Sequence, residues 1–332
     1  MFANKNQSHM RRILSVLEHE FGRAFANLVD VGAALGTNSR WKEFYPLIKT
    51  IGFEPGRQEF EKLVCSETEL WINTALASNN ESRTIYLTKY WSNTSLLRPN
   101  QTLLDTLAWG DDHRIVGEET IACDTIDAVL EEKKLGLDFL KVDTQGTELD
   151  ILQGATASIK STTVVEVEVE FAPLYQGQPL FADVDSFLRS QGFYLHDLGN
   201  VLHVKPRSYP STGGPKGRII SADALYFRDP QLAVEIIGSH DDRKMAALLI
   251  GYLAYGFPEL CLLALEALKK QGKQRFWTES IKADILNIQH SSQTLRWLPA
   301  QNILARIGRK CWQSLYKTNG SLWDFPLGNK LF

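Results

Sequence analysis

The sequence contains few cysteines, and they lie far from one another. The four are Cys65, Cys123, Cys261 and Cys311, with no CxxC pair and no cluster of cysteine with histidine. A structural zinc site needs closely spaced ligands, and disulfide frameworks belong to small cysteine-rich chains, so we expect neither. Reduced thiols in a cytoplasmic protein are the simplest account.

Long apolar runs and a strong charge of one sign are also missing. The first seven residues carry no apolar signal core, and the most apolar later run, residues 245–257, is too short to span a membrane. A formal net charge of −3 leaves no basic footprint for nucleic acid. We therefore expect no membrane span and no nucleic-acid partner. The 332 residues, 44% of them hydrophobic, are enough to bury a large core.

The sequence does contain an apolar run that ends in a turn of small residues. Residues 27–31 predict a buried strand, and Gly32 and Gly36 allow the backbone to turn sharply and to approach a ligand. Glu54 ends a second short apolar run, 24 residues after Asp30. In nucleotide-binding α/β units a carboxylate meets a ribose at an offset of about 20 residues. The pattern therefore indicates a ligand that carries a ribose.

Two phosphate-binding signatures are absent from the same turn. A dinucleotide fingerprint reads G-x-G-x-x-G, but Ala34 stands where the second glycine would admit a pyrophosphate, and no Gly-Lys-Ser/Thr follows. An aspartate at the end of the strand suits a ligand with an ammonium group. S-adenosylmethionine has an ammonium, a ribose and no phosphate, so it is the favoured cofactor. An NAD-linked oxidoreductase and a purely structural glycine turn are the alternatives.

Strands and helices alternate up to residue 229, and only helices follow Pro230. Strands are predicted at residues 27–31, 50–53, 70–77, 84–89, 137–143, 163–171, 194–197 and 223–228, helices at 10–25, 57–64, 125–134, 148–159 and 181–191, and loops over 90–118. The alternation predicts an α/β fold with a mainly parallel, doubly wound, twisted sheet and an antiparallel hairpin at one edge. We expect a first domain at residues 1–229 and a C-terminal all-helical region at 230–332. That region holds Trp277, Trp297, Trp312 and Trp323 and could form a homodimer interface.

The most distinctive motif is Leu137-Asp-Phe-Leu-Lys-Val-Asp-Thr-Gln-Gly-Thr-Glu-Leu-Asp-Ile-Leu-Gln-Gly-Ala155. Together with residues 30–39 and 53–55, it resembles the FkbM-type methyltransferases, which are S-adenosylmethionine-dependent enzymes of the Rossmann-like class I fold and act mostly on oxygen. The matching positions are Lys141, Asp143, Gly146, Glu148, Leu152, Gly154 and Ala155. Gln145 departs from the pattern, because the family usually has glutamate before the glycine. The resemblance covers residues 27–228.

The resemblance implies a cofactor site built from these motifs. Glu54 would accept hydrogen bonds from both ribose hydroxyls. Asp143, at the carboxyl end of a strand, would contact the methionine ammonium or face the acceptor. The other residues implied at the cofactor are Asp30, Gly32, Ala33, Gly36 and Asn38 for the methionine portion, Pro55 beside the ribose, and Ala77 and Ser78 near the adenine.

Three carboxylates alternate with valines within residues 163–171. Glu166, Glu168 and Glu170 therefore share one face of a strand on which both faces should be apolar. This arrangement is costly unless the carboxylates are paired or enter a site. Methyl transfer to a hydroxyl needs a group that removes its proton, and the candidate bases are Asp143, Glu170 and His196. His113, in a loop, is more simply a solvated surface residue.

The acceptor class is implied by the resemblance alone. The family commonly serves antibiotic, glycolipid and surface-glycan pathways, so the hydroxyl of a sugar or glycan, a glycolipid or a polyketide is implied. A divalent metal could bind near Asp143, but no residue pattern indicates one. A cofactor-binding assembly subunit without catalysis, with the C-terminal helices as its interface, is a further alternative.

Overall fold

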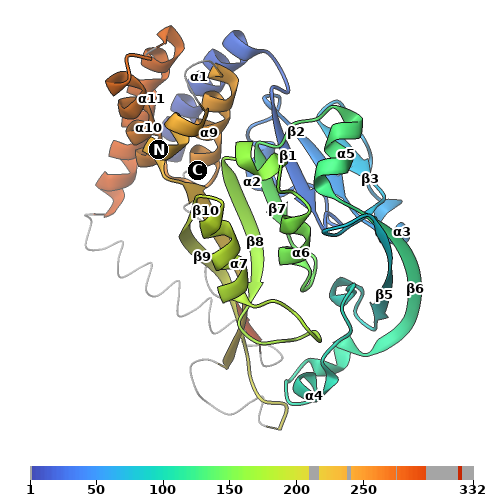
Figure 1. Cartoon of the computed structure of the whole chain (residues 1–332). Helices are drawn as coiled ribbons and strands as arrows, with labels where there is room; N and C mark the ends of the chain where they lie inside the picture. Colours follow the sequence, from blue (N-terminus) through green and yellow to red (C-terminus); the bar gives the residue numbers. More distant parts are fainter. Residues whose placement is uncertain (1, 209–216, 238–240, 274, 297–320, 324–332) are drawn as a thin grey trace.

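The main sheet has eight strands in the order β11-β9-β10-β8-β7-β1-β2-β3. The computed structural model describes residues 2–208, 217–237, 241–273, 275–296 and 321–323 (Figure 1). The parallel strands are β1 (Ala26–Val31), β2 (Ile48–Phe53), β3 (Glu69–Ile72), β7 (Phe139–Val142) and β8 (Val164–Glu170). β10 (Arg218–Arg228) lies antiparallel between β8 and β9 (Phe193–Val204), and β11 (Ser321–Trp323) pairs antiparallel with β9. The predicted parallel sheet with an antiparallel hairpin is confirmed.

A second, smaller sheet has the order β4-β6-β5 and stands apart from the first (Figure 1). The predicted strand at 70–77 ends at Ile72, and β4 (Ala75–Leu76) joins this second sheet instead. β5 (Glu81–Thr88) pairs antiparallel with β6 (Ile115–Asp124), so the predicted antiparallel extension is confirmed, but the prediction of loop up to residue 118 is wrong. The segment between them forms η1 (Trp91–Asn93), α4 (Gln101–Leu104) and η2 (Gly110–His113).

One face of the main sheet is covered by three helices from the middle of the chain. α5 (Ile126–Lys133), α6 (Glu148–Gln153) and α7 (Phe181–Ser190) share a buried cluster with Val165, Val167 and Val169 of β8. A short turn, η3 (Ser158–Ser161), leads from α6 into β8. The valines of the alternating run therefore face this side, and its glutamates face the other.

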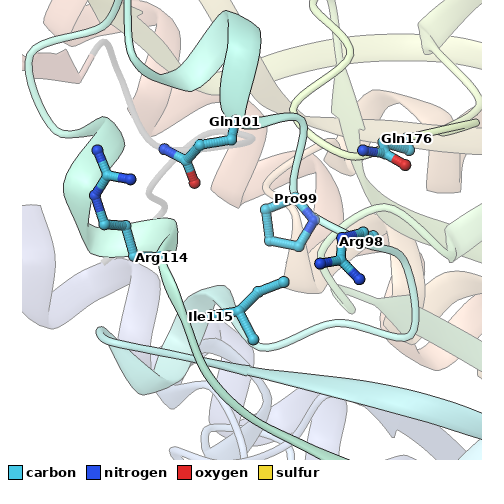
Figure 2. A pocket seen from close by; sticks show the side chains of 6 residues that line it. All are labelled: Arg98, Pro99, Gln101, Arg114, Ile115 and Gln176. Atoms are coloured by element: carbon cyan, nitrogen blue, oxygen red, sulfur yellow. The ribbon is translucent and has the colours of Figure 1, made fainter.

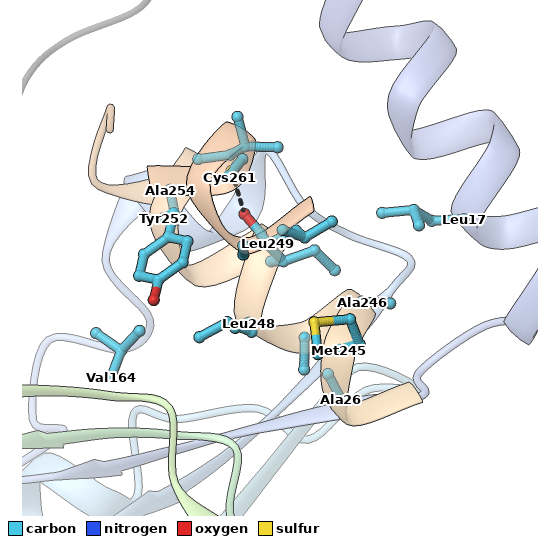
Figure 3. Packing of buried hydrophobic residues seen from close by; sticks show 14 of the residues in the cluster. Leu17, Ala26, Val164, Met245, Ala246, Leu248, Leu249, Tyr252, Ala254 and Cys261 are labelled. Carbon is cyan, nitrogen blue, oxygen red and sulfur yellow. Dashed lines mark hydrogen bonds between the residues drawn. The ribbon is translucent and has the colours of Figure 1, made fainter. Parts of the chain in front are cut away.

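The opposite face is covered by helices from both ends of the sequence. α2 (Ser39–Lys42) and α3 (Arg57–Phe60) have only four residues each and cover little of the sheet. Instead α1 (Phe2–Phe21) packs with α8 (Pro230–Ile237), α9 (Asp242–Ala254), α10 (Pro258–Lys270) and α11 (Phe276–Arg296) (Figure 1). Side chains of α9 reach Leu17 of α1 and Ala26 and Val164 of the sheet (Figure 3). The C-terminal helices therefore share one core with the sheet.

The predicted helical region begins at Pro230, but the prediction that it is all-helical is wrong, because β11 adds a strand from this region to the main sheet. The division of the chain at Pro230 stays a prediction. Trp277 is buried in the shared core, whereas Trp297, Trp312 and the side chain of Trp323 lie outside the described residues. Cys123 and Cys261 are buried, and Cys65 is exposed, all with free thiols. Among the helices that the structure describes, none is long and apolar enough to cross a membrane.

Arg228 at the end of β10 gives a stability prediction. Its buried guanidinium donates to the carbonyl oxygens of Thr162 (2.9 Å), Gln191 (2.6 Å), Ile159 (2.9 Å) and Lys160 (3.2 Å). Arg228→Met leaves these carbonyls without their donor, so we expect a loss of about 2–4 kcal/mol in the free energy of unfolding, measured in urea. Arg189→Met, which removes an exposed arginine from α7, should cost less than about 1 kcal/mol and serves as the control.

Candidate active site

The first glycine turn joins the carboxyl ends of three parallel strands. The amides of Gly32 and Ala33 donate to the Phe53 carbonyl oxygen at 3.0 and 3.1 Å. Gly32 has φ +81°, and a Cβ built on it would lie 1.9 Å from the carbonyl oxygen of Asp143. Glycine is therefore required because β1 and β7 approach closely here. Since both amides already have partners, the cofactor contacts predicted for Gly32 and Ala33 would come from other atoms of the turn.

The turn continues into α2 with local hydrogen bonds. The Gly36 amide donates to the Ala33 carbonyl oxygen at 2.8 Å. The Asn38 side chain caps α2 by accepting from the Arg40 amide at 3.0 Å. Both residues lie at the predicted edge of the sheet, and their contacts with a cofactor stay predictions.

Glu54 lies directly after β2, beside the turn. Its Oε1 accepts from the Gly56 amide at 2.7 Å, and its own carbonyl oxygen accepts from Asn73 Nδ2 at 2.8 Å. Asn73 Nδ2 also donates to the Pro55 carbonyl oxygen at 3.1 Å, so the loop around the carboxylate is held from both sides. Burial raises the pKa of Glu54 to about 7, while the hydrogen bond from Gly56 lowers it. The carboxylate is fixed in position, as two hydrogen bonds to a ribose would require.

The two residues predicted near an adenine differ in their exposure. Ala77 is fully buried, and its amide donates to the Asp124 carbonyl oxygen at 2.8 Å. A Cβ built on Gly154 would lie 2.2 Å from the carbonyl oxygen of Ala77. Ser78 follows it and accepts from Asn79 Nδ2 at 3.1 Å. The contribution of Ala77 is thus packing, and the adenine contact at Ser78 stays a prediction.

A row of charged side chains crosses the sheet just below the turn. Asp30, Lys141 and Glu166 are direct neighbours on β1, β7 and β8. Lys141 Nζ lies 3.3 Å from Asp30 Oδ1 and 3.7 Å from Asp143 Oδ2. Glu166 accepts from Tyr255 and lies 3.3 Å from Arg40 Nη1. Burial raises the pKa of Asp30, and the buried Lys141 keeps a raised pKa because of the carboxylates around it. The row therefore joins the carboxyl edge of the sheet to the core by paired charges.

Beyond this row, three glutamates form a carboxylate cluster, defined here as Glu148, Glu168 and Glu170. One carboxyl oxygen of each lies within 4.8 Å of the others, a spacing that a divalent cation could bridge. Burial raises the pKa of all three, and that of Glu168 and Glu170 well above the usual value, with neighbouring carboxylates adding to the effect. The sequence-based prediction of no metal stays a prediction. Glu168 and Glu170 therefore enter the site, whereas Glu166 is paired beneath α9.

The turn after β7 holds the cluster in place. Glu148 Oε1 accepts from the amides of Thr144 (2.9 Å) and Gly146 (3.0 Å), so this residue does more than start a helix. Gln145, with φ +62°, donates from Nε2 to Glu168 Oε2 at 2.8 Å and lies 3.5 Å from Asp143 Oδ1. Asp143 is 39% exposed, so the site is open to solvent on this side. The side-chain amide of Gln145 thus joins Asp143 to the carboxylate cluster.

The geometry contradicts the predicted catalytic role of His196. This residue lies on β9 opposite Leu225 and Tyr226, which pair with the start of β8, about 13 Å along the strand from Glu170. Its ring packs against Phe257 at 4.4 Å between centroids. His196 is therefore an exposed residue beside Phe257 and is remote from Asp143 and the cluster.

His113 is also placed differently from its prediction as a surface residue. It is 2% exposed, stacks on Trp109 at 4.8 Å between centroids, and lies 6.0 Å from the ring of Tyr175. Burial lowers its pKa to about 4. A neutral imidazole in this position packs the loop over the site, and the sequence carries no sign of this burial.

A mainly parallel sheet with an antiparallel strand after the last crossover, and acidic residues at the carboxyl ends of β1, β2 and β7, define a class I methyltransferase fold. The family model of the FkbM methyltransferase domain matches residues 30–195, half of the chain. This protein belongs to the FkbM methyltransferase family. No curated protein sequence matches the chain.

Three solved structures are similar to most of the chain at low identity. A proposed RNA methyltransferase from Pyrococcus horikoshii is 9% identical, with 66% of this chain and 81% of that one covered and a TM-score of 0.31. A TehB-like SAM-dependent methyltransferase from Corynebacterium glutamicum is 9% identical, with coverages of 65% and 87% and a TM-score of 0.29. Magnesium protoporphyrin IX methyltransferase from Synechocystis PCC 6803, solved with bound SAM, is 11% identical, with coverages of 68% and 80% and a TM-score of 0.27.

Proposed function

We propose that this protein transfers a methyl group from S-adenosylmethionine to a hydroxyl group of a sugar or glycan, a glycolipid or a polyketide-type acceptor. The observation that carries the proposal is that acidic groups stand at the carboxyl ends of β2, β7 and β8, along one edge of the sheet: Glu54, Asp143 and Glu170. One end of this series suits the cofactor, and the other end offers carboxylates to an acceptor.

The cofactor end is supported by the chemistry of its donor set. Glu54 is a fixed carboxylate for a ribose diol, and Asp143 is a partly exposed carboxylate for an ammonium group. The turn that joins them contains Gly32, where any Cβ would collide with the Asp143 backbone. When bound, S-adenosylmethionine supplies a methyl group already activated by its sulfonium. The chain therefore has to orient the acceptor and remove its proton.

Glu170 is the group that we propose as the base. It lies at the carboxyl end of β8, in the carboxylate cluster next to Asp143. Burial and the neighbouring carboxylates raise the pKa of Glu170 well above its ordinary value, which gives the carboxylate more driving force to take a proton from an alcohol.

The alternatives differ in what they predict. Membership of a methyltransferase family contradicts the NAD-linked oxidoreductase. A non-catalytic cofactor-binding assembly subunit would bind S-adenosylmethionine without turning over any acceptor. Isothermal titration with S-adenosylmethionine, followed by a methyl-transfer screen against methyl glycosides, glycolipids and polyketide alcohols, tests the proposal. Binding without turnover, together with a co-purifying partner, would favour the assembly subunit and its interface on the C-terminal helices.

The pKa of Glu54 gives a prediction for cofactor affinity. A carboxyl with a pKa of about 7 must lose its proton before it can accept two hydrogen bonds from a ribose. We expect the affinity for S-adenosylmethionine to fall about tenfold to thirtyfold as the pH drops from 8 to 5.5, measured by isothermal titration. Glu54→Gln should bind more weakly at pH 8 and show little of this pH dependence.

Stability should depend on the same group in the opposite sense. Because the pKa of Glu54 is raised on folding, its contribution to stability is fully present below about pH 4.5 and is lost as the pH rises through about 7. In the cofactor-free protein, Glu54→Gln should therefore be as stable as the wild type at pH 5 and more stable at pH 8. A wild-type affinity that does not change between pH 5.5 and 8 would show that Glu54 does not hold the ribose.

A further inference from the structure

Gln178 has a buried side-chain donor without a partner. The residue lies in the loop between β8 and α7 and is 7% exposed. Its Oε1 accepts from the Tyr175 amide at 3.1 Å, which fixes the orientation of the side-chain amide. Among the residues that the structure describes, Nε2 makes no hydrogen bond. A buried donor left unsatisfied destabilises the protein by about 1–3 kcal/mol, so a ligand that accepts a hydrogen bond from Nε2 would remove this cost.

The unpartnered nitrogen lies beside the turn that holds the carboxylate cluster. A Cβ built on Gly146 would lie 2.9 Å from Gln178 Nε2, and the amide of Gly146 itself binds Glu148. Nε2 also lies close enough to Glu170 to lower the pKa of that carboxyl. The donor and the Glu170 carboxylate are therefore neighbours at the carboxyl end of β8.

The loop that carries Gln178 is held firmly. The Asn100 amide donates to the Leu174 carbonyl oxygen at 2.7 Å, and the Gln176 amide donates to the Arg98 carbonyl oxygen at 2.8 Å. Tyr175 OH donates to the Asn93 carbonyl oxygen at 2.9 Å. These bonds tie the loop to the chain around η1 and α4. The donor is thus held in place before any acceptor binds, as an effective binding site requires.

The ligand group that fits must both accept and donate. Gln178 Nε2 needs an acceptor atom, and Glu170 needs a donor or a positive charge. An ammonium group and a metal ion have no lone pair to offer Gln178, and a carboxylate or a phosphate would be repelled by the cluster. A hydroxyl group offers one O–H donor and two acceptor lone pairs, and it satisfies both sides at once.

We infer that Gln178 and Glu170 together bind the hydroxyl group of the acceptor and select alcohols over amines. The hydroxyl oxygen accepts from Gln178 Nε2, and its O–H donates to Glu170. In the transfer, the oxygen forms a bond to the methyl carbon while the carbon–sulfur bond breaks and its electron pair returns to sulfur. The hydroxyl proton passes to Glu170. This inference rests on the proposed function and adds the residue that recognises the oxygen.

Gln176 gives a matched control in the same loop. It is exposed and lines a surface pocket of about 290 Å³ together with Arg98, Pro99 and Arg114 (Figure 2). Substitutions of Gln176 and Gln178 therefore change the same residue type two positions apart, one at the surface and one at the cluster. Gln178→Met keeps the shape without the donor, and Gln178→Glu keeps the acceptor for Tyr175 without the donor.

The probes are methyl α-glycosides of glucose, galactose and mannose and their 2-amino-2-deoxy counterparts, assayed with S-adenosylmethionine. For the wild type we expect alcohol methylation only. For Gln178→Met and Gln178→Glu we expect kcat/KM for the alcohol to fall about tenfold to a hundredfold, while the affinity for S-adenosylmethionine stays within twofold. Gln178→Glu, which has no N–H to offer, should gain activity on the amino sugar relative to the alcohol. Gln176→Met should match the wild type.

Three outcomes would overturn the inference. If Gln178→Met methylates the alcohols as the wild type does, the hydroxyl is not bound by Gln178, and the proposed function stands without it. If the wild type methylates the amino groups of these sugars but none of the hydroxyls, both the inference and the proposed O-methylation fail. If no alcohol of the panel is methylated although S-adenosylmethionine binds, the inference fails for sugar hydroxyls, whereas the proposed function is then decided by the glycolipids and polyketide alcohols of the wider screen.

Discussion

Glu170→Gln should lower kcat about 100- to 10,000-fold, while the affinity for S-adenosylmethionine changes little. A general base in the transition state contributes a factor of this size, and glutamine has the shape of glutamate but cannot take up the proton. The effect should appear in kcat, because the side-chain amide of the new glutamine still occupies the place of the Glu170 carboxyl beside Gln178. The ratio of the two kcat values is measured from methyl transfer to the acceptor found in the screen, at saturating cofactor.

The stability of the same variant separates chemistry from folding. Because the pKa of Glu170 is raised on folding, the wild-type carboxyl contributes stability below its unfolded pKa and loses that contribution as the pH rises. A neutral glutamine has no such loss, so Glu170→Gln should be at least as stable as the wild type at pH 8. Glu119→Gln, on the exposed part of β6, is the control for both measurements. A Glu170→Gln enzyme that keeps more than a tenth of the wild-type kcat would assign the base to another residue.

The carboxylates of this site could be predicted because their sequence pattern conflicts with their position in the fold. Glu168 and Glu170 alternate with valines in a central strand, where an unpaired carboxylate is costly, so a site at the strand end was the natural explanation. Gln178 had no such conflict to reveal it. Its importance comes from an approach to Gly146 that depends on how the loop after β8 folds back, and no local pattern encodes that approach.

β6 and His196 differ from their predicted places for the same reason, since no local pattern encodes how distant strands pair. β6 was missed because only one of its residues, Cys123, is buried. Its residues therefore show little apolar periodicity, and pairing with β5 decides its conformation. His196 was a candidate base, and its strand was predicted at residues 194–197 only. β9 runs to Val204, and its carboxyl end lies far from His196. Strand length thus decided where this residue falls along the sheet.

The helix predicted at residues 57–64 is too long, because α3 ends at Phe60, and this has a structural consequence. α2 and α3 are single turns, so one face of the sheet lacks the cover that crossover helices usually provide. α9 takes that place. Gly251 lies where α9 crosses the sheet, and a Cβ there would lie 2.5 Å from Val164 Cγ2 and 3.2 Å from the ring of Phe139. The helix therefore packs against β7 and β8 at close range.

Removal of residues 230–332 should abolish folding altogether. The shared core contains fully buried side chains of α9 and α10, including Leu248, Leu249, Tyr252 and Cys261, whose thiol donates to the Leu249 carbonyl oxygen at 3.5 Å (Figure 3). Burial of each large apolar side chain contributes about 1.5–3 kcal/mol, and a whole domain is stable by only about 5–15 kcal/mol. We therefore expect the chain of residues 1–229 to be aggregated or to lack a cooperative thermal transition, as measured by circular dichroism.

The matched control is a chain that ends at Arg296, which keeps α8 to α11 and with them the cover of the sheet. It should unfold cooperatively and bind S-adenosylmethionine, because Glu54 and Asp143 lie far along the sequence from the deleted segment. The opposite result for the shorter chain, a cooperative transition with cofactor binding by residues 1–229, would show that the chain divides into two domains at Pro230. The expected result would instead make the C-terminal helices part of the methyltransferase core. These helices cover Phe139 of β7 and Val164 of β8, the two strands that lead to Asp143 and Glu170.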